Sequence, residues 1–223
     1  MLVPVKGEGE RVKKKNRPLS PVTGGEPAHR ERGPGRLGGI THSLVIADDG
    51  LAEGVRYLPS SNHDERPPGT QIELLVIHNI SLPPGEFGGS AIVEFFTNRL
   101  DPAAHPYYAT IADHRVSAHF LIRRDGEIIQ FVPCGSRAWH AGASDWRGRG
   151  RCNDFSIGIE LEGSDDTPFE NVQYEALAEL TRALRMRYPI ADIVGHSDIA
   201  PGRKTDPGPH FDWTRCREMW VKA

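Results

Sequence analysis

The chain has 223 residues, which is enough for one domain with a substantial hydrophobic core. No apolar run approaches the length of a membrane-spanning helix, so we expect no membrane partner. The net charge of −3 is uneven, because residues 1–40 hold nine Lys or Arg against four Asp or Glu and leave −8 for the remainder. Three cysteines without close spacing predict neither a disulfide framework nor a CxxC metal site, and favour the reducing cytoplasm: Cys134, Cys152 and Cys216.

Residues 1–40 are predicted to form a disordered basic arm. Thirteen of these forty residues are Gly or Pro, and no hydrophobic period is visible. The three lysines at 13–15 admit contact with nucleic acid or acidic lipid, but such a short run is usually only solvated, so we expect no nucleic-acid partner. The arm also lacks the apolar stretch of a secretory signal. The remaining residues, 41–223, are predicted to form a single domain.

The first part of this domain predicts one buried strand and one helix. Residues 72–77 (IELLVI) form a nearly continuous apolar run that ends at His78, as is typical of a strand buried on both faces. The Pro- and Gly-rich loop at 81–89 is expected to border a site at the end of that strand. Residues 90–100 predict a helix capped by their first serine, whereas residues 101–113 show no clear period.

A hairpin and a separate strand are predicted in the middle of the chain. Residues 116–132 predict a β-hairpin around a turn at 124–127. The first strand of this hairpin alternates, with one face made of Val116, Ala118, Phe120 and Ile122. Residues 156–162 (SIGIELE) alternate in the same way, so their apolar residues face inward and Glu160 and Glu162 lie on the opposite face.

The last part of the chain predicts two helices with a strand between them. A helix is expected over residues 172–187, where leucines recur on one face, and Pro189 ends it. Residues 189–194 (PIADIV) are a weaker strand candidate, and Asp212 is expected to cap a short terminal helix. Helices mixed with a hairpin predict the α/β class, as a single domain with a central mixed β-sheet flanked by helices.

Two histidines follow two of these predicted strands. His78 comes directly after residues 72–77, and His196 follows residues 189–194 with only Gly195 between. Because open α/β sheets place their sites at the carboxyl ends of strands, we expect the two imidazoles to lie close together. Asp206 follows ten residues after His196, in a loop stiffened by prolines. Two histidines and a carboxylate match the ligands of a catalytic zinc ion with an open position, and the alternative is a charged surface turn with two structural histidines.

Acid–base chemistry at such a site needs a further titratable group. Glu160 is the best candidate, because it sits mid-strand on the face opposite the apolar residues. Glu162 shares that face and competes with it, and a solvent-facing carboxylate is the structural alternative. Lys204 lies two residues before Asp206, where it either stabilises an oxyanion or is one more exposed lysine.

Other aromatic and histidine side chains allow two interpretations. Trp139 and His140 lie in a loop, where an aromatic ring is a natural wall for a sugar or a peptide stem, or else a core anchor. His119 supports the site or is a satisfied core histidine, and the core is favoured.

Five runs of the sequence resemble one family. In chain order, they are LLVIHNISLPPGEFGG, HRVSAHFLIRRDGEIIQFV, RAWHAG, RCNDFSIGIELEG and GHSDIAPGRKTDPGP. Together they resemble the AmpD-type 1,6-anhydro-N-acetylmuramoyl-L-alanine amidases, within the wider zinc amidase group that includes peptidoglycan recognition proteins. The resemblance spans about residues 45–215. It implies an amidase and peptidoglycan recognition protein-like fold for residues 41–223.

The resemblance also implies roles for individual residues. The family's zinc ligands fall on His78, His196 and Asp206, which would hold one Zn²⁺ per chain. Its catalytic glutamate and lysine fall on Glu160 and Lys204. Its substrate contacts fall on Asn79, Arg115, Trp139 and His140. An aspartate ligand combined with a glutamate resembles the cytoplasmic recycling branch of the family rather than the secreted lytic enzymes.

The function implied is hydrolysis of the amide between 1,6-anhydro-N-acetylmuramic acid and L-alanine during peptidoglycan recycling. The expected partner is a muropeptide substrate, and the protein is expected to be a cytoplasmic monomer. One alternative is a peptidoglycan-binding protein without catalysis, against which the complete ligand set and Glu160 argue. Another is a general murein amidase that cuts intact wall, against which the missing secretory signal argues.

Overall fold

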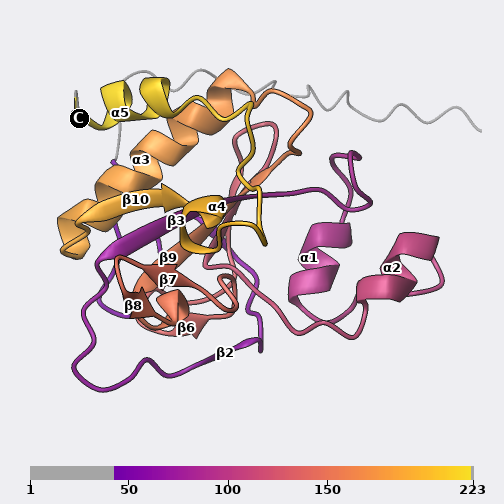
Figure 1. The fold of residues 1–223 in the computed structure, drawn as a ribbon, viewed down its shortest axis with the longest axis horizontal. Coiled ribbons are helices and arrows are strands. Elements are labelled where there is room, and N and C mark those ends of the chain that lie inside the picture. Colours follow the sequence, from indigo (N-terminus) through magenta and orange to yellow (C-terminus); the bar gives the residue numbers. More distant parts are fainter. Residues whose placement is uncertain (1–42, 222–223) are drawn as a thin grey trace, which may run out of the picture. The chain divides into compact units, whose positions relative to one another are not determined.

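The computed structural model of the protein describes residues 43–221 (Figure 1). The basic arm predicted at residues 1–40 lies outside this range and stays a prediction. Across the described range, none of the helices has the length and apolar character needed to cross a membrane.

A six-stranded sheet forms the centre of the fold. In spatial order its strands are β1 (Arg56–Tyr57), β5 (Ile128–Gln130), β4 (Phe120–Ile122), β9 (Ser156–Glu162), β3 (Leu74–Ile80) and β10 (Asp192–Gly195). The strands β4 and β5 form the predicted antiparallel hairpin, whereas every other neighbouring pair is parallel. The predicted central mixed sheet is therefore confirmed.

Helices and two small ladders surround this sheet. The helices are α1 (Ala91–Phe96), α2 (Pro106–Ile111), the 3₁₀ turn η1 (Cys152–Asp154), α3 (Asn171–Arg187), α4 (His196–Ile199) and α5 (Trp213–Val221). The ladders are antiparallel and pair β2 (His63–Asp64) with β6 (Arg137–Ala138) and β7 (Asp145–Trp146) with β8 (Arg149–Gly150). The predicted cap of α5 is present, because the Asp212 carboxylate accepts the backbone N–H of Arg215 at 2.9 Å.

Helix α3 covers one face of the sheet (Figure 1). Its leucines pack on alternate residues of the two central strands, namely Leu75, Ile77, Ile157, Ile159 and Leu161. These residues include the predicted inward face of 156–162, and all are fully buried. Because side chains alternate along a strand, His78 of β3 and Glu160 of β9, which pair in register, point to the opposite face. These two polar side chains of the central strands therefore face away from α3.

The hairpin differs from its prediction in one respect. The ladder begins only at Phe120, because Ser117 pairs instead with Trp139 and Asn62 in an irregular segment. As a result the predicted alternation breaks. Val116 and Ala118 pack with Leu121 in the core around α1, while Phe120 and Ile122 pack under α3.

The helices after β3 also differ from the prediction. Helix α1 ends at Phe96 rather than near residue 100, because Asn98 adopts a left-handed backbone conformation with φ 57°. Helix α2 was not predicted, although a proline at its first position and His105 at its N-cap are start signals. His105 Nδ1 accepts the backbone N–H of Tyr107 at 3.1 Å.

We expect Leu177→Ala to destabilise the fold by about 2–5 kcal/mol, because it leaves a cavity under α3 where the side chain is fully buried. Met186 lies on the same helix but is 86% exposed, so Met186→Ala is expected to change the free energy of unfolding by about 0.5 kcal/mol or less. Urea unfolding of the two variants measures both values. Equal effects would contradict the packing described for α3.

Candidate active site

Three side chains from separate segments meet on the sheet face opposite α3. His78 comes from β3, His196 from the first position of α4, and Asp206 from the loop after α4. The Nδ1 atoms of the two histidines lie 3.0 Å apart, and each lies 3.0 Å from Oδ2 of Asp206. Both imidazoles are buried, and the aspartate is half-buried. The prediction placed His78 just past its strand, whereas the strand continues through it to Ile80.

Strand register and loop contacts bring these residues together. The parallel pairing of β10 with β3 sets Gly195 opposite Ile77, so the next residue, His196, begins α4 close to His78. The backbone N–H of Ser197 donates to the carbonyl of Asp206 at 2.9 Å and folds the loop back onto α4. A Cβ atom on Gly195 would lie 2.7 Å from Pro207 Cδ, so only glycine allows this loop to approach so closely.

The three ligand atoms fit a divalent metal ion. His196 Nε2 faces the carbonyl oxygen of Ala141 at 3.1 Å, so Nε2 carries the ring proton and Nδ1 keeps its lone pair. This lone pair, the Asp206 oxygen and Nδ1 of His78 face one another, and electron-rich atoms this close are stabilised by a cation between them. The 3.0 Å separations are near the roughly 3.3 Å of a tetrahedral site with zinc–nitrogen bonds of about 2.0–2.1 Å.

The protonation states of the group suit metal binding. Burial lowers the pKa of His78 to about 4, so this imidazole is neutral at pH 7 and has a lone pair to offer. Burial acts to raise the pKa of Asp206, but its close contacts with His196 and His78 outweigh burial and hold that pKa below its ordinary value. The aspartate is therefore an anion at neutral pH.

Glu160 lies beside this group on the neighbouring strand. In the parallel register of β3 and β9, it is directly opposite His78. Its side chain is buried, and its Oε2 atom has no hydrogen-bond partner among the described residues. Burial raises the pKa of Glu160 well above its ordinary value, the negative charge of Asp206 adds to this, and the positive charge of Lys204 opposes it. A carboxyl group in this condition is suited to exchange protons near neutral pH.

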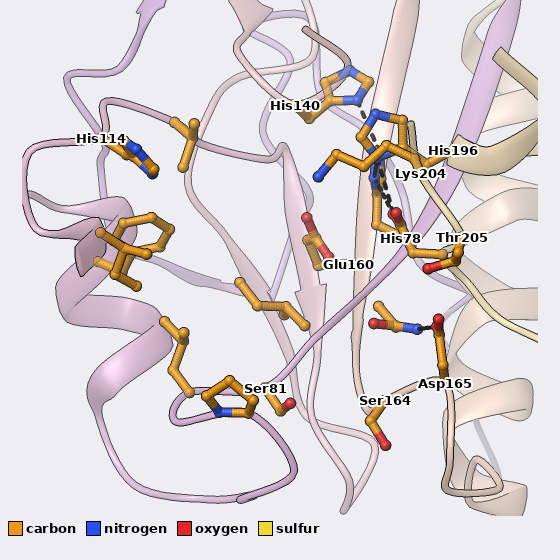
Figure 2. Close-up of a pocket in the computed structure, with 18 of the residues that line it drawn as sticks. His78, Ser81, His114, His140, Glu160, Ser164, Asp165, His196, Lys204 and Thr205 are labelled. Carbon is orange, nitrogen blue, oxygen red and sulfur yellow. Dashed lines mark hydrogen bonds and ion pairs between the residues drawn. The ribbon is translucent and has the colours of Figure 1, made fainter. Parts of the chain in front are cut away.

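The group opens into a cavity of about 780 Å³, which is large enough for a small-molecule substrate. Figure 2 shows the side chains of Glu160 and Lys204 pointing into the cavity next to the two histidines. At the other end, α1, α2 and the loop after β3 contribute an apolar wall that includes Phe95, Phe96, Tyr107 and Ile111. The cavity therefore has a charged end, at the group of His78, His196 and Asp206, and an apolar end.

A family model for N-acetylmuramoyl-L-alanine amidase matches residues 68–209. The chain belongs to this family. The 1,6-anhydro-N-acetylmuramyl-L-alanine amidase AmpD of Escherichia coli strain K12 is 58% identical over 180 residues, covering 80% of this chain and 98% of that protein. The AmpD of Enterobacter cloacae is 58% identical over 177 residues, covering 78% of this chain and 95% of that protein. A crystal structure of a selenomethionine derivative of AmpD superimposes with a TM-score of 0.76 and 58% identity, covering 78% of this chain and 99% of that one.

These comparisons confirm the resemblance that the five sequence runs predicted, together with the amidase fold and the assignment of the chain as an amidase. They identify no residue of this chain as a ligand or a catalytic group, so the individual roles stay predictions.

The amidase cavity contains most of the residues predicted to contact substrate. Asn79, Trp139 and His140 line it together with His78, His196 and Asp206. The Asn79 amide donates to Oδ1 of Asp165 at 2.7 Å, and the Trp139 indole N–H donates to Asp64 at 3.1 Å. Arg115 is exposed and is not part of the lining, because its guanidinium donates to backbone carbonyls of its own loop.

Several lining residues were not predicted. Ser164, Asp165, Asp166 and Thr167 border the cavity directly after β9, and His114 borders it after α2. A signal for the first group was present, since it follows the carboxyl end of a parallel strand. The loop at 81–89, which was expected to border the site, supplies Ser81, Leu82, Pro84 and Gly85. His119 is fully buried and accepts the Gly158 N–H at Nδ1, as a core histidine does.

We expect Glu160→Gln to stabilise the metal-free amidase at pH 8. The raised pKa of Glu160 means that the folded state keeps a proton the unfolded state loses, so this group lowers stability as the pH rises above the unfolded-state value. The gain should shrink toward pH 5. Urea unfolding with a chelator at both pH values measures it.

Glu162→Gln is the matched control, because the Glu162 carboxylate accepts backbone N–H groups from Gly88 and Arg124 and pairs with Arg123. This substitution is expected to destabilise the protein at both pH values. A Glu160→Gln variant with the same stability as the parent throughout would contradict the buried, unpartnered state described for Glu160.

Proposed function

We propose that this amidase hydrolyses the amide between 1,6-anhydro-N-acetylmuramic acid and L-alanine of muropeptides, during peptidoglycan recycling. The observation that carries the proposal is the buried Glu160 beside the group of His78, His196 and Asp206, in one cavity of substrate size. The choice of substrate is supported by the 58% sequence identity to AmpD proteins, which extends over 95–98% of their length.

We further propose that the metal is one zinc ion per chain, held by His78, His196 and Asp206. Two imidazole nitrogens and one carboxylate oxygen are a common ligand set of catalytic zinc, with a fourth position left open. When bound, zinc supplies Lewis-acid activation of water and of the scissile carbonyl. The role of the three side chains is to hold the ion in a fixed geometry, and burial keeps the His78 imidazole neutral while its contacts keep Asp206 ionised at neutral pH.

Glu160 acts as the general base and then the general acid. It takes a proton from the attacking water and delivers it to the alanine nitrogen as the amide bond breaks. Its raised pKa suits both steps, because the carboxylate must gain and then lose a proton near neutral pH. Glu162 does not compete for this role, since its carboxylate is bound to the backbone of Gly88 and Arg124 and lies outside the cavity lining.

Lys204 stabilises the oxyanion that forms when water adds to the carbonyl. Its ammonium group lines the same end of the cavity, and its positive charge acts on Glu160. A fixed cation at the developing negative charge is a large contribution to amide hydrolysis. Asn79, Trp139, His140 and Arg115 remain the proposed substrate contacts, and the first three line the cavity.

The proposed compartment is the cytoplasm, and the proposed form is a monomer. All three cysteines are buried and free, as is typical of a protein that works in a reducing compartment. The alternative is a peptidoglycan-binding protein without catalysis. Glu160 favours the enzyme, because burying a carboxyl oxygen without a hydrogen bond within residues 43–221 lowers stability, and binding alone does not require such a group.

The substrate is tested by incubating the purified protein with anhydro-muropeptide and, separately, with intact sacculi. We expect rapid release of L-alanyl peptide from the muropeptide and little release from the sacculi. Equal release of peptide from both substrates would contradict the recycling role and indicate a general murein amidase. Binding of muropeptide without release of peptide would contradict the enzyme.

We expect the purified protein to hold about one zinc ion per chain, and His78→Ala and His196→Ala to lose it, because two remaining ligands form a poor site. Asp206→Ala should weaken zinc binding in the same direction. Elemental analysis of the dialysed proteins measures the content, and full occupancy in either histidine variant would exclude these ligands.

We expect Glu160→Ala to keep zinc but to lose turnover of anhydro-muropeptide by about two to four powers of ten, the usual contribution of general acid–base catalysis. Lys204→Ala should slow the reaction by about two to three powers of ten. Glu162→Ala is the matched control and should cost much less activity, although it loosens the contact with Gly88. An inactive Glu162→Ala beside an active Glu160→Ala would reverse the assignment.

A further inference from the structure

The metal-binding histidines are both oriented by one dipeptide, His140–Ala141. His78 Nε2 lies 3.0 Å from His140 Nδ1, and His140 Nε2 lies 3.1 Å from the hydroxyl of Ser156. Because Nδ1 of His78 faces the metal group, its proton is on Nε2 and is donated to His140. The second ring then donates from Nε2 to Ser156. The side chain of His140 therefore fixes the tautomer and the plane of His78.

The second residue of the dipeptide orients the other histidine. His196 Nε2 donates to the backbone carbonyl of Ala141 at 3.1 Å. The guanidinium of Arg203 donates to the same carbonyl at 2.8 Å and to that of Ala143 at 2.6 Å. The Ala141 carbonyl that accepts the His196 hydrogen bond is thus fixed by a second hydrogen bond, from Arg203, the residue before Lys204.

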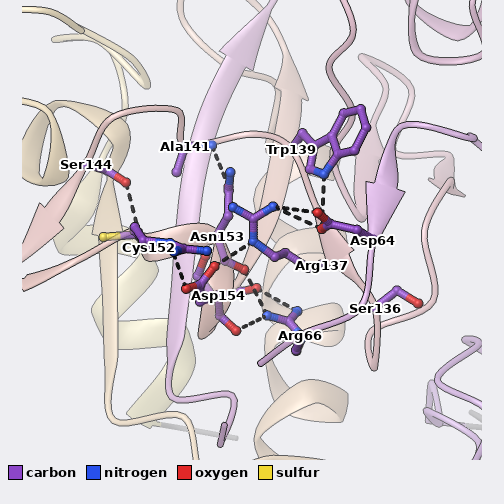
Figure 3. A network of polar contacts seen from close by, with 12 residues as sticks. Asp64, Arg66, Ser136, Arg137, Trp139, Ala141, Ser144, Cys152, Asn153 and Asp154 are labelled. Atoms are coloured by element: carbon purple, nitrogen blue, oxygen red, sulfur yellow. Dashed lines mark hydrogen bonds and ion pairs between the residues drawn. The ribbon is translucent and has the colours of Figure 1, made fainter. Parts of the chain in front are cut away.

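The side chain of Asn153 accepts hydrogen bonds from the backbone of both residues of the dipeptide. Oδ1 of Asn153, in the 3₁₀ turn η1, accepts the backbone N–H of Ala141 at 2.8 Å (Figure 3). The same oxygen accepts the backbone N–H of His140 at 3.2 Å. Asn153 is buried, does not line the cavity and contacts neither metal-binding histidine. Its two hydrogen bonds fix the position from which the imidazole of His140 and the carbonyl of Ala141 point toward the two histidines.

The sheet leaves room for this arrangement at one glycine. A Cβ atom on Gly158 of β9 would lie 2.4 Å from Cγ of His140, closer than any real side chain allows. The ring of His140 therefore packs directly on the backbone of the strand that carries Glu160. A larger residue at this position would displace the imidazole that receives the His78 proton.

From these contacts we infer that Asn153 is a positioning residue of the metal site, acting through His140 and Ala141 on both histidine ligands. This inference rests on the proposed zinc function. Partners that orient metal ligands raise metal affinity by about 10- to 100-fold, so their loss should appear in the zinc dissociation constant of the protein, independently of turnover.

The test is the zinc dissociation constant of the full-length protein, measured by competition with a chromophoric chelator. Asn153→Ala removes the shared acceptor, and His140→Ala removes the acceptor of the His78 proton. Both should weaken zinc binding by about 10- to 100-fold. Asn153→Asp keeps an acceptor oxygen, and His140→Asn places an amide oxygen near the position of Nδ1, so both should bind zinc close to the parent's affinity.

The matched control is Asn62→Ala. Asn62 is another buried asparagine, whose amide donates to the Val116 carbonyl at 2.8 Å and to Asn98 at 3.0 Å, away from the metal group. This variant should melt at a lower temperature than the parent but bind zinc equally well. It separates a loss of hydrogen bonding in the fold from a loss of ligand orientation.

Two results would overturn this inference while leaving the proposed function intact. One is a parent that binds zinc and an Asn153→Ala variant that binds it as tightly. The other is an Asn62→Ala variant whose zinc affinity falls as much as that of Asn153→Ala. If Asn153→Ala does not fold, the pair His140→Ala and His140→Asn decides the same question, because equal zinc affinities in that pair would also overturn it. A parent protein that binds no zinc would instead overturn the proposed function, and the inference with it.

Discussion

The parallel register of β9, β3 and β10 is the constraint on which the site depends. It sets Glu160 opposite His78 and Gly195 opposite Ile77, which starts α4 at His196 in reach of the first histidine. A shift of one residue in either pairing would turn these side chains toward α3. The apolar residues packed under α3 hold that register, so the packing that stabilises the fold also fixes the geometry of the site.

The same burial makes the site chemically active and energetically costly. It keeps His78 neutral, and it leaves a carboxyl oxygen of Glu160 without a hydrogen-bond partner among residues 43–221. A buried polar atom without a hydrogen bond lowers the free energy of unfolding by about 1–3 kcal/mol. The burial of apolar side chains beneath α3 offsets this loss. In the proposed mechanism, stability is thus lowered at the position where acid–base chemistry needs a buried carboxyl group, as is common at active sites. Glu162 lies two residues further along the same strand and differs from Glu160 in its hydrogen bonding. Both of its carboxylate oxygens accept backbone N–H groups, one from Gly88 and one from Arg124.

Much of this organisation was predictable because it depends on local pattern. The alternation of residues 156–162 gave both the strand and the face of Glu160, and helix 172–187 was set by its leucines and Pro189. The irregular course of residues 116–119 was not predictable, since it depends on contacts with Asn62 and Trp139 far away in the sequence. The role inferred for Asn153 has the same origin. Nothing in its local sequence indicates that its side chain reaches the dipeptide that contacts both His78 and His196.

The central claim is that His78, His196 and Asp206 bind one zinc ion together. X-ray absorption at the zinc edge of the loaded protein tests it most directly, because the ligand atoms and their distances are read without reference to activity. We expect two imidazole nitrogens at about 2.0–2.1 Å and oxygen ligands at about 2.0–2.2 Å. A sulfur ligand at about 2.3 Å, or a zinc environment without imidazole, would contradict it.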